Sequence, residues 1–450
     1  MSQFIQILSN NNTKNTIMEG IDCHCHVFNI TSVGLRALLE KILEAKTLIE
    51  NNNKIDRTTD SSDKVKRSLS DLIELAKIFC GDSETILSML DKHYNRKFKL
   101  LPLMFDGDFL LDGASDEEKT HIKNAVQMVH DHLNIHYKTV QSPQNSHRNL
   151  IDALNEIMQK MEDDIDQKMR DGFTVQYDDL VAIKKNKKYS NKVFPFLGID
   201  PRRNNIDTLI QQVGKNKTFA GIKLYPPNGF SPSDPRLDNM YNYCSQNNIP
   251  IIVHCSYGGF ATPVKTLQVN GYILKKGESI PVEYNGEITF EKGLLIDTYS
   301  EMVRERARLL NHPRIWGKVL EKHPRLKLVL AHFGDSDDKN CLDEWRNEIK
   351  ILMTQYPSLY TDISCMSDAD CTHLNKVKTI YDTNPALQGR ILYGSDYFLD
   401  MFFNSSFDEY LNRIKGVFKT KSFNQISKVN TENFVNSWYK SVSVLENVKK

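Results

Sequence analysis

The chain has 450 residues, of which 40% are hydrophobic and 26% charged, a composition typical of globular proteins with a large core. Its 58 lysines and arginines balance 57 aspartates and glutamates, so the net charge of +1 offers no basic field for a nucleic acid or an anionic membrane. The length fits one barrel with insertions as well as two or three ordinary domains.

The sequence predicts a cytoplasmic protein that acts on a small-molecule substrate. It has no run of about eighteen apolar residues, and residues 1–20 carry asparagines where a signal peptide needs an apolar core. The eight cysteines are scattered without a CxxC pair, which favours buried free thiols over disulfides. We therefore expect neither a nucleic-acid partner nor a membrane partner.

The segment IDCHCH, residues 21–26, is the most informative motif of the chain. In the strand predicted at 20–25, alternate side chains share a face, so His24 and His26 project together and the two cysteines project to the opposite side. Two neutral imidazoles side by side form half of a metal site. A structural histidine in a buried strand is the alternative.

Apolar residues at three- and four-residue spacing predict that residues 30–98 form a helical insertion after the first strand. The apolar run at 98–105 predicts the second strand. Three aspartates follow it, at Asp106, Asp108 and Asp112. Because no glutamate closes a calcium-binding loop, a solvated loop is favoured over a metal site here.

Six further apolar runs predict strands at 193–199, 219–224, 250–254, 326–332, 359–363 and 390–393. Helical patterns lie at 116–135, 147–170, 204–214, 235–247, 299–322, 338–355 and 369–383. Eight strands alternating with helices predict an α/β fold with parallel pairing, a (β/α)₈ TIM barrel that forms one domain over 1–450. An open doubly wound sheet also alternates, but no glycine-rich phosphate loop follows the first strand.

Polar residues end several of these strands, and the six candidates are His24, His26, Lys223, His254, His332 and Asp396. Barrel enzymes assemble their sites at the carboxyl ends of the strands, so we expect the six to converge. Imidazoles and a carboxylate match the ligands of a catalytic zinc, which keeps one position open for water. The alternatives are an amine of Lys223 that binds substrate and an Asp396 that caps the following helix.

The order HxH, Lys, His, His, Asp resembles the amidohydrolase superfamily. The segments IDCHCHVFN, HPRIWGKVLEKHPRLKLVLAHFGD and LYGSDYF are similar to the branch that includes aminocarboxymuconate-semialdehyde decarboxylase. The likeness runs from residue 20 to about 400 and is weakest over 30–98 and 256–298, which look like insertions of this member.

This resemblance implies one or two divalent ions, with zinc expected and manganese as the alternative. The ligands implied for the single-metal form are His24, His26, His254 and Asp396. His332 would then be a ligand of a second metal or a polarising group. The segment GIKLYP resembles strand four of dihydroorotases, whose lysine is carboxylated, so Lys223 is either a carboxylated bridging ligand or an ordinary amine.

The metal suggests the chemistry, because a bound divalent ion lowers the pKa of water from 15.7 toward about 7. In a hydrolase, Asp396 would move the proton of that water and His332 would stabilise the oxyanion as an amide, lactone or ester is cleaved. The alternatives are decarboxylation of an unsaturated carboxylic acid and a non-catalytic barrel scaffold. The presence of all six polar residues counts against the scaffold.

Three residues are predicted to contact the substrate: Arg202, Tyr225 and Tyr257. The arginine would meet a substrate carboxylate, although a structural ion pair is the alternative. The glycine-containing segment 255–298 is predicted to be a long irregular loop that acts as a lid over the barrel mouth. By analogy with such relatives we expect a homodimer.

Overall fold

A computed structural model describes residues 18–28, 82–116, 165–275, 277–292, 299–335, 342–366, 371–402, 404 and 406–435. Its parallel strands are β1 (Gly20–Cys25), β2 (Phe98–Pro102), β3 (Phe196–Gly198), β4 (Gly221–Leu224), β5 (Ile251–Val253), β8 (Leu328–Leu330), β9 (Leu359–Asp362) and β10 (Ile391–Leu392). Each lies within one of the predicted runs. The α/β fold with parallel strands is therefore confirmed.

The strands form two parallel sheets, one of β1 and β2 and one in the order β10-β9-β8-β5-β4-β3. Backbone hydrogen bonds also connect the two sheets, because Phe194 N donates to Leu100 O at 2.9 Å and Cys23 N donates to Tyr393 O at 3.1 Å. The first strand thus lies beside the segment that directly follows β10.

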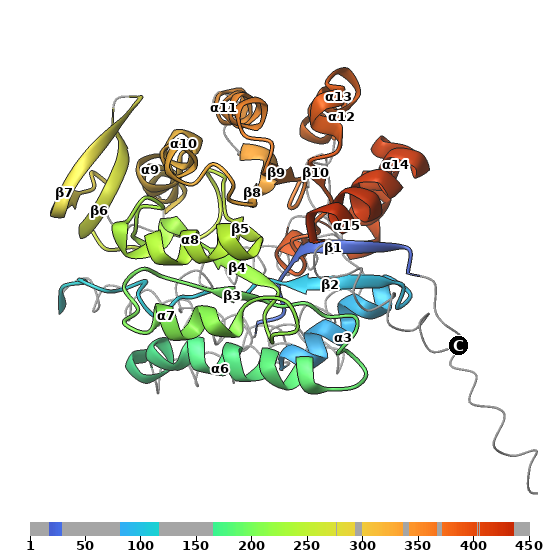
Figure 1. Ribbon diagram of the computed structural model, residues 1–450, viewed down its shortest axis with the longest axis horizontal. Coiled ribbons are helices and arrows are strands. Elements are labelled where there is room, and N and C mark those ends of the chain that lie inside the picture. The colour runs from blue at the N-terminus through green and yellow to red at the C-terminus, as the bar shows by residue number, and fades with distance from the viewer. Residues whose placement is uncertain are drawn as a thin grey trace, which may run out of the picture.

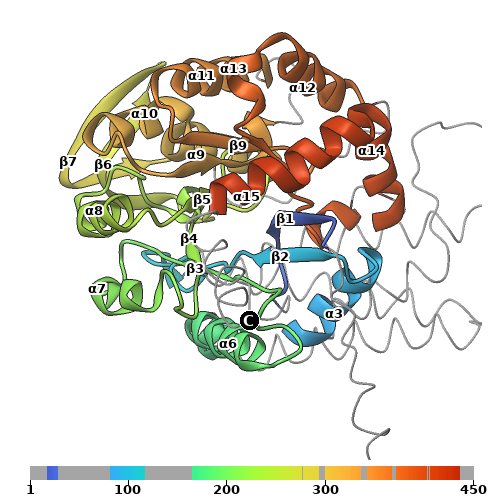
Figure 2. The ribbon, with the colours of Figure 1, turned by 45° about the vertical axis from the view of Figure 1, so that its right-hand side comes forward.

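Helices surround the strands (Figures 1 and 2). They are α3 (Ser83–His93), α6 (Ile165–Lys185), α7 (Ile206–Leu209), α8 (Asp238–Asn247), α9 (Tyr299–Asn311), α10 (Pro313–Lys322), α11 (Leu342–Gln355), α12 (Thr372–Thr383), α13 (Pro385–Gln388), α14 (Phe407–Asn424) and α15 (Asn430–Val435). Short 3₁₀ turns span Ile210–Gln212, Pro226–Asn228, Pro235–Leu237, Ala331–Gly334 and Leu399–Phe402, and a π turn spans Gln425–Val429.

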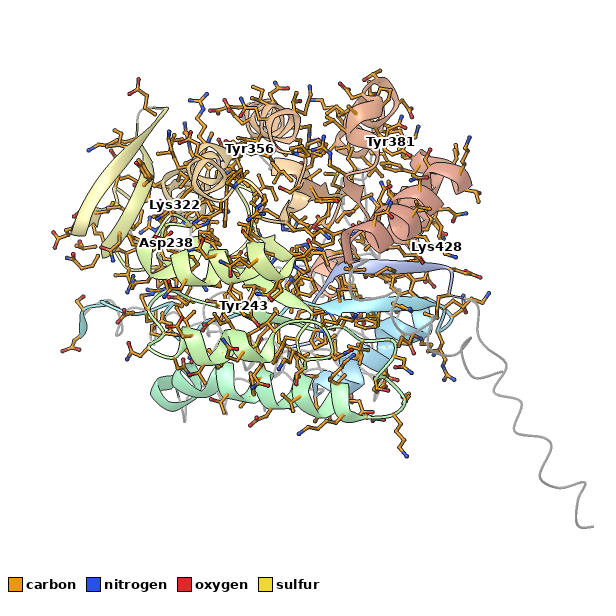
Figure 3. The ribbon with its side chains drawn as sticks, viewed as in Figure 1. Asp238, Tyr243, Lys322, Tyr356, Tyr381 and Lys428 are labelled. Atoms are coloured by element: carbon orange, nitrogen blue, oxygen red, sulfur yellow. The ribbon has the colours of Figure 1, made fainter. Side chains whose placement is uncertain are left out.

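Helix α10 illustrates how local sequence sets these elements. Pro313 occupies the first turn, where a missing N–H costs nothing, and the His312 side chain accepts a hydrogen bond from Arg314 N. The apolar residues of the helix are buried at three- and four-residue spacing. On its outer end, Lys322 pairs with Asp238 of α8 at 2.5 Å (Figure 3), which joins neighbouring helices at the surface.

The prediction of an irregular loop at 255–298 is wrong for much of that segment. An antiparallel hairpin occupies it, with strands β6 (Thr266–Lys275) and β7 (Glu278–Thr289), and it projects at one side of the molecule (Figure 1). Leu267 and Val269 are buried whereas Gln268 is exposed, which is the strand alternation. Gly271 interrupts the pattern at a shift of register.

The solvated loop predicted after the second strand is also wrong in part. Asp106 is buried, and Arg203 donates to Asp106 Oδ1 at 2.6 Å and to Asp108 Oδ2 at 2.6 Å. Asp112 is mostly exposed, as expected. The difference arises because an arginine that follows β3 reaches back to the carboxylates that follow β2.

The described residues include only parts of some other predicted segments. Within the insertion predicted at 30–98, α3 is helical as expected, and most of the helix predicted at 116–135 lies outside the described residues. The six described cysteines are free thiols, and four of them are buried. Within the described parts of the chain, every helix is too short or too polar to cross a bilayer.

Candidate metal centre

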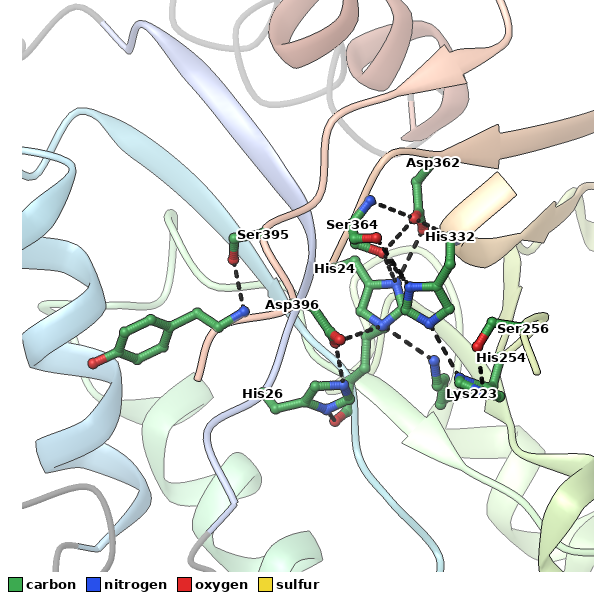
Figure 4. A network of polar contacts seen from close by, with 12 residues as sticks. His24, His26, Lys223, His254, Ser256, His332, Asp362, Ser364, Ser395 and Asp396 are labelled. Carbon is green, nitrogen blue, oxygen red and sulfur yellow. Dashed lines mark hydrogen bonds and ion pairs between the residues drawn. The ribbon is translucent and has the colours of Figure 1, made fainter. Parts of the chain in front are cut away.

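His24 and His26 present their Nε2 atoms to a common point (Figure 4). His26 Nδ1 lies 2.9 Å from the carbonyl of Leu103, and His24 Nδ1 lies 3.0 Å from Asp362 Oδ2. A carbonyl and an ionised carboxylate only accept hydrogen bonds, so each neutral ring carries its proton on Nδ1. The lone pair of each ring is then on Nε2.

Asp396 faces both of these lone pairs. Its Oδ1 lies 3.1 Å from His26 Nε2 and 3.3 Å from His24 Nε2, and this buried oxygen accepts no hydrogen bond from the described residues. Two nitrogen lone pairs and an anionic oxygen repel one another unless a cation lies among them. Imidazole nitrogen and carboxylate oxygen are ligands that divalent metals prefer, so the three residues fit a metal ion.

His332 and His254 form a second pair of facing nitrogens, with 3.1 Å between His332 Nε2 and His254 Nδ1. His332 Nδ1 lies 3.2 Å from the carbonyl of Ser364, and His254 Nε2 lies 2.9 Å from the carbonyl of Gly258. Each carbonyl fixes a proton on the nitrogen beside it, so the facing nitrogens both carry lone pairs. This position can take a shared proton or a cation.

Two residues of the site were missed by the sequence analysis, Asp362 and Ser364. Asp362 Oδ1 accepts hydrogen bonds from His332 N at 2.9 Å and Ser364 N at 3.0 Å, while its Oδ2 contacts His24. Ser364 Oγ lies 2.9 Å from His332 Nδ1. The carboxylate therefore positions two histidines that are far apart in the sequence.

Lys223 reaches the same cluster from β4. Its side chain is buried, and Nζ lies 3.4 Å from His24 Nε2. Burial lowers the pKa of Lys223 to about 8, against the opposing charges of Asp396 and Asp362. A lysine so placed has a larger neutral fraction near pH 7 than an exposed one.

The electrostatic environment keeps the proposed ligands in the forms that bind metal. Burial, with the charge of Lys223, lowers the pKa of His24 to about 3, and burial together with His332 lowers the pKa of His254 well below its ordinary value. The two histidines therefore stay neutral, the form in which an imidazole binds a metal ion.

The backbone is unusual at two of these residues. Asp396 has φ of 60° and His332 has φ of 62°, both in the left-handed region. Residues other than glycine rarely adopt this backbone conformation. It persists where surrounding contacts hold it, often at functional sites. The backbone of Asp396 is held because its N–H donates to His24 O at 2.7 Å.

The three residues predicted to contact substrate lie in different settings. Tyr225 stacks on His254 with ring centres 4.4 Å apart, and so borders the site. Arg202 forms an ion pair with Asp200 at 2.7 Å, which is the structural alternative stated for it. Tyr257 packs against Trp345 with ring centres 4.2 Å apart.

Comparison with solved structures found weak likenesses. An uncharacterised TIM-barrel protein from Bordetella bronchiseptica is 18% identical with a TM-score of 0.34, over 58% of this chain and 71% of that chain. A probable 2-pyrone-4,6-dicarboxylic acid hydrolase from Acinetobacter baumannii is 9% identical with a TM-score of 0.43, over 93% and 100%. The 5-carboxyvanillate decarboxylase from Sphingomonas paucimobilis is 8% identical with a TM-score of 0.39, over 93% and 98%.

No curated protein matches the chain. A family model does, and it is described as amidohydrolase and matches residues 21–418. That span includes all six polar residues that the sequence analysis selected, from the CHCH segment to the aspartate after the last strand. The chain therefore belongs to the amidohydrolase family.

Proposed function

We propose that the protein is a metal-dependent hydrolase that cleaves an amide, lactone or ester bond. The observation that carries the proposal is the buried Asp396 Oδ1, which accepts no hydrogen bond from the described residues and faces the Nε2 lone pairs of His24 and His26. Membership of the amidohydrolase family supports it.

His24, His26 and Asp396 would hold the ion, with zinc expected and manganese as the alternative. When bound, a divalent ion polarises the scissile carbonyl and makes water acidic enough to lose a proton near pH 7. Lys223 contacts His24 of this group, and His254 contacts His332. We propose both as further ligands, with Lys223 carboxylated if two ions bind.

The chain's own residues would move the protons. Asp396 accepts the proton of the attacking water and returns it to the leaving group. His332 carries one proton on Nδ1, so it stabilises an oxyanion only when Nε2 is protonated as well. In the form in which His254 is not a ligand, a proton shared across the 3.1 Å between His332 Nε2 and His254 Nδ1 would supply that donor.

We propose that the eight parallel strands close into one (β/α)₈ barrel in a single domain. The backbone bonds from β2 to the residues before β3, and from β1 to the segment after β10, support closure. Residues 30–98 would be an insertion, and the segment 255–298, which contains the hairpin, would cover the mouth. A cytoplasmic location, a small-molecule substrate and a homodimer stay predictions.

The test uses the full chain. Metal content is measured on the purified protein, and turnover is measured on a panel of amides, lactones and esters before and after removal and return of zinc or manganese. We expect bound metal, hydrolysis that chelation abolishes, and loss of both in His26→Gln. His323→Gln is the matched control, because His323 is a buried histidine that contacts Asp238 instead.

Three results would count against the proposal. One is a wild-type protein that binds no metal under any loading condition, and another is turnover at the wild-type rate in His26→Gln. Release of carbon dioxide from an unsaturated acid, without hydrolysis on the panel, would establish the decarboxylase alternative in its place.

A further inference from the structure

We propose that Asp22 is a positioning residue that holds Asp396 at the metal centre. Its side chain connects β1, which carries His24 and ends just before His26, to the loop after the last strand, which carries Asp396. The inference rests on the proposed metal site and extends it, because Asp22 would contact neither metal nor substrate. Its role would be to set the distance of Asp396 from His24 and His26.

Each carboxyl oxygen of Asp22 accepts two hydrogen bonds. Its Oδ1 accepts hydrogen bonds from Ser395 N at 3.0 Å and His24 N at 3.2 Å. Its Oδ2 accepts from Ser395 Oγ at 2.6 Å and from Tyr94 OH at 2.9 Å. The side chain is fully buried, and each of these hydrogen bonds is donated to it by its partner.

The loop of Asp396 is held on both of its sides through this carboxylate. Ser395 is bound to Asp22 by its backbone N–H and by its hydroxyl, and Ser395 Oγ in turn accepts a hydrogen bond from Tyr397 N at 2.9 Å. Asp396 lies between these two anchored residues in the left-handed conformation. The chain does not adopt that conformation freely, so the anchors fix the direction of the Asp396 side chain.

Stability alone is a poor reason for this arrangement. A buried carboxylate loses its hydration, and an apolar group of similar size often stabilises a core as well or better. Backbone bonds already join the two segments, since Ser395 N and Asp396 N both approach His24 O, at 3.0 and 2.7 Å. What Asp22 adds is orientation of the loop that carries a metal ligand.

The experiment is a calorimetric titration of zinc into the metal-free full chain, with circular dichroism as the check of folding. We expect Asp22→Asn and Ser395→Ala to weaken zinc binding about 10- to 100-fold, as loss of residues that orient ligands commonly does. Ser395→Thr, which keeps the hydroxyl, should bind zinc as the wild type does. Tyr94→Phe is the matched control, because it removes one bond to Asp22 and leaves Ser395 anchored.

The outcomes separate this inference from the proposed function. If the wild type binds no zinc, the metal site itself is wrong. If the wild type binds zinc and the folded Ser395→Ala and Asp22→Asn proteins bind it equally well, Asp22 is only structural and the inference is overturned. Should Asp22→Asn fail to fold, the comparison of Ser395→Ala with Ser395→Thr decides the question by itself.

Discussion

Asp362 determines which nitrogen of His24 carries the proton. Its Oδ2 accepts from His24 Nδ1 at 3.0 Å, which leaves Nε2 free to face Asp396. Burial opposes ionisation of Asp362, but the hydrogen bonds that it accepts from His24 and Ser364 hold its pKa below the usual range. Asp362 therefore keeps the proton of His24 on Nδ1, so that the Nε2 lone pair can bind a metal ion.

Replacing Asp362 by Asn should weaken zinc binding about 10- to 100-fold. The amide can turn its NH₂ toward His24 Nδ1, which moves the ring proton to Nε2 and removes the lone pair that the metal needs. Zinc affinity is measured by competition with a chelating dye. Thr361→Val in the same strand is the control, because it removes a buried hydrogen bond to Leu330 O without touching His24, and equal affinities in the two variants would contradict this role of Asp362.

Gly259 borders the site at close range, and Gly259→Ala should impair it. The residue has φ of +94°, and an added Cβ would lie 2.4 Å from Tyr225 Oη and 2.9 Å from His254 Cε1. We expect a backbone cost of about 1–2 kcal/mol and a loss of turnover as these two rings move. Gly258→Ala is the control, since its nearest contact is 3.9 Å away. Turnover and melting temperature report the difference, and similar losses in both variants would exclude the steric explanation.

The sequence led to His254, His332 and Asp396 because a polar residue that ends an apolar run marks the end of a buried strand. It led to His24 and His26 because they alternate within one strand. The first of these two rules could have selected Asp362, which ends the run LYTD. Asp22 was visible too, because it shares a strand face with His24 two residues later. Ser364 and Ser395 carry no such signal, since a serine in a loop has many ordinary roles and its partners lie on distant strands.

At the scale of elements, α9 holds both ends of the hairpin formed by β6 and β7. Arg306 of α9 is fully buried and donates to the carbonyls of Thr262 and Val264 before the hairpin and to that of Lys292 after it, at 3.2, 3.2 and 2.7 Å. Its guanidinium also lies 4.1 Å from the ring centre of Phe290. One side chain thus ties the hairpin to the body of the fold.

Arg306→Met should lower the free energy of unfolding by about 3 kcal/mol or more, because three carbonyls lose a donor and each such loss costs about 1–3 kcal/mol. Urea unfolding measures the change, and limited proteolysis should show earlier cleavage near residues 262–292. Arg308→Met, an exposed position on the same helix, should change stability by less than about 0.5 kcal/mol. Equal effects of the two substitutions would show that the buried contacts contribute little.

Strand positions were predictable because buried parallel strands are continuous apolar runs between helical patterns. The hairpin was not predicted, although its first strand alternates, because glycines and a shift of register interrupt the pattern. The helices α14 and α15 at the end of the described chain were also not predicted. Helix α14 nevertheless carries helical signals, because Ser406 caps its first turn and Phe407, Tyr410, Leu411 and Ile414 are buried at three- and four-residue spacing.

At the scale of the whole molecule, the low pKa of His312 predicts that the folded protein loses stability in acid. Burial, with the charges of Arg314 and Arg308, lowers the pKa of His312 to about 3. The unfolded chain takes up a proton at this residue below about pH 6.5 and the folded chain does not. The stabilisation present above pH 6.5 is therefore lost as the pH falls toward 3, by up to about 1.4 kcal/mol per pH unit.

His312→Asn should reduce the slope of the free energy of unfolding against pH by the contribution of about one proton. The Asn oxygen can still cap α10 by accepting from Arg314 N, so the fold has no reason to change. Urea unfolding of both proteins at pH 7, 6 and 5 gives the two slopes. Parallel slopes would mean that His312 is not the group that the folded protein keeps neutral.

The contact between the first strand and the loop after the last one also sets when the metal centre can form. His26 and Asp396 are separated by about 370 residues, which a ribosome adds at about 5–20 residues per second, so roughly 20 to 70 seconds pass between their syntheses. During that interval the two histidines exist without their carboxylate. Metal acquisition in the geometry described must therefore follow synthesis of the chain as far as residue 396, and a chain that stops before residue 396 can carry the CHCH segment but never complete the centre.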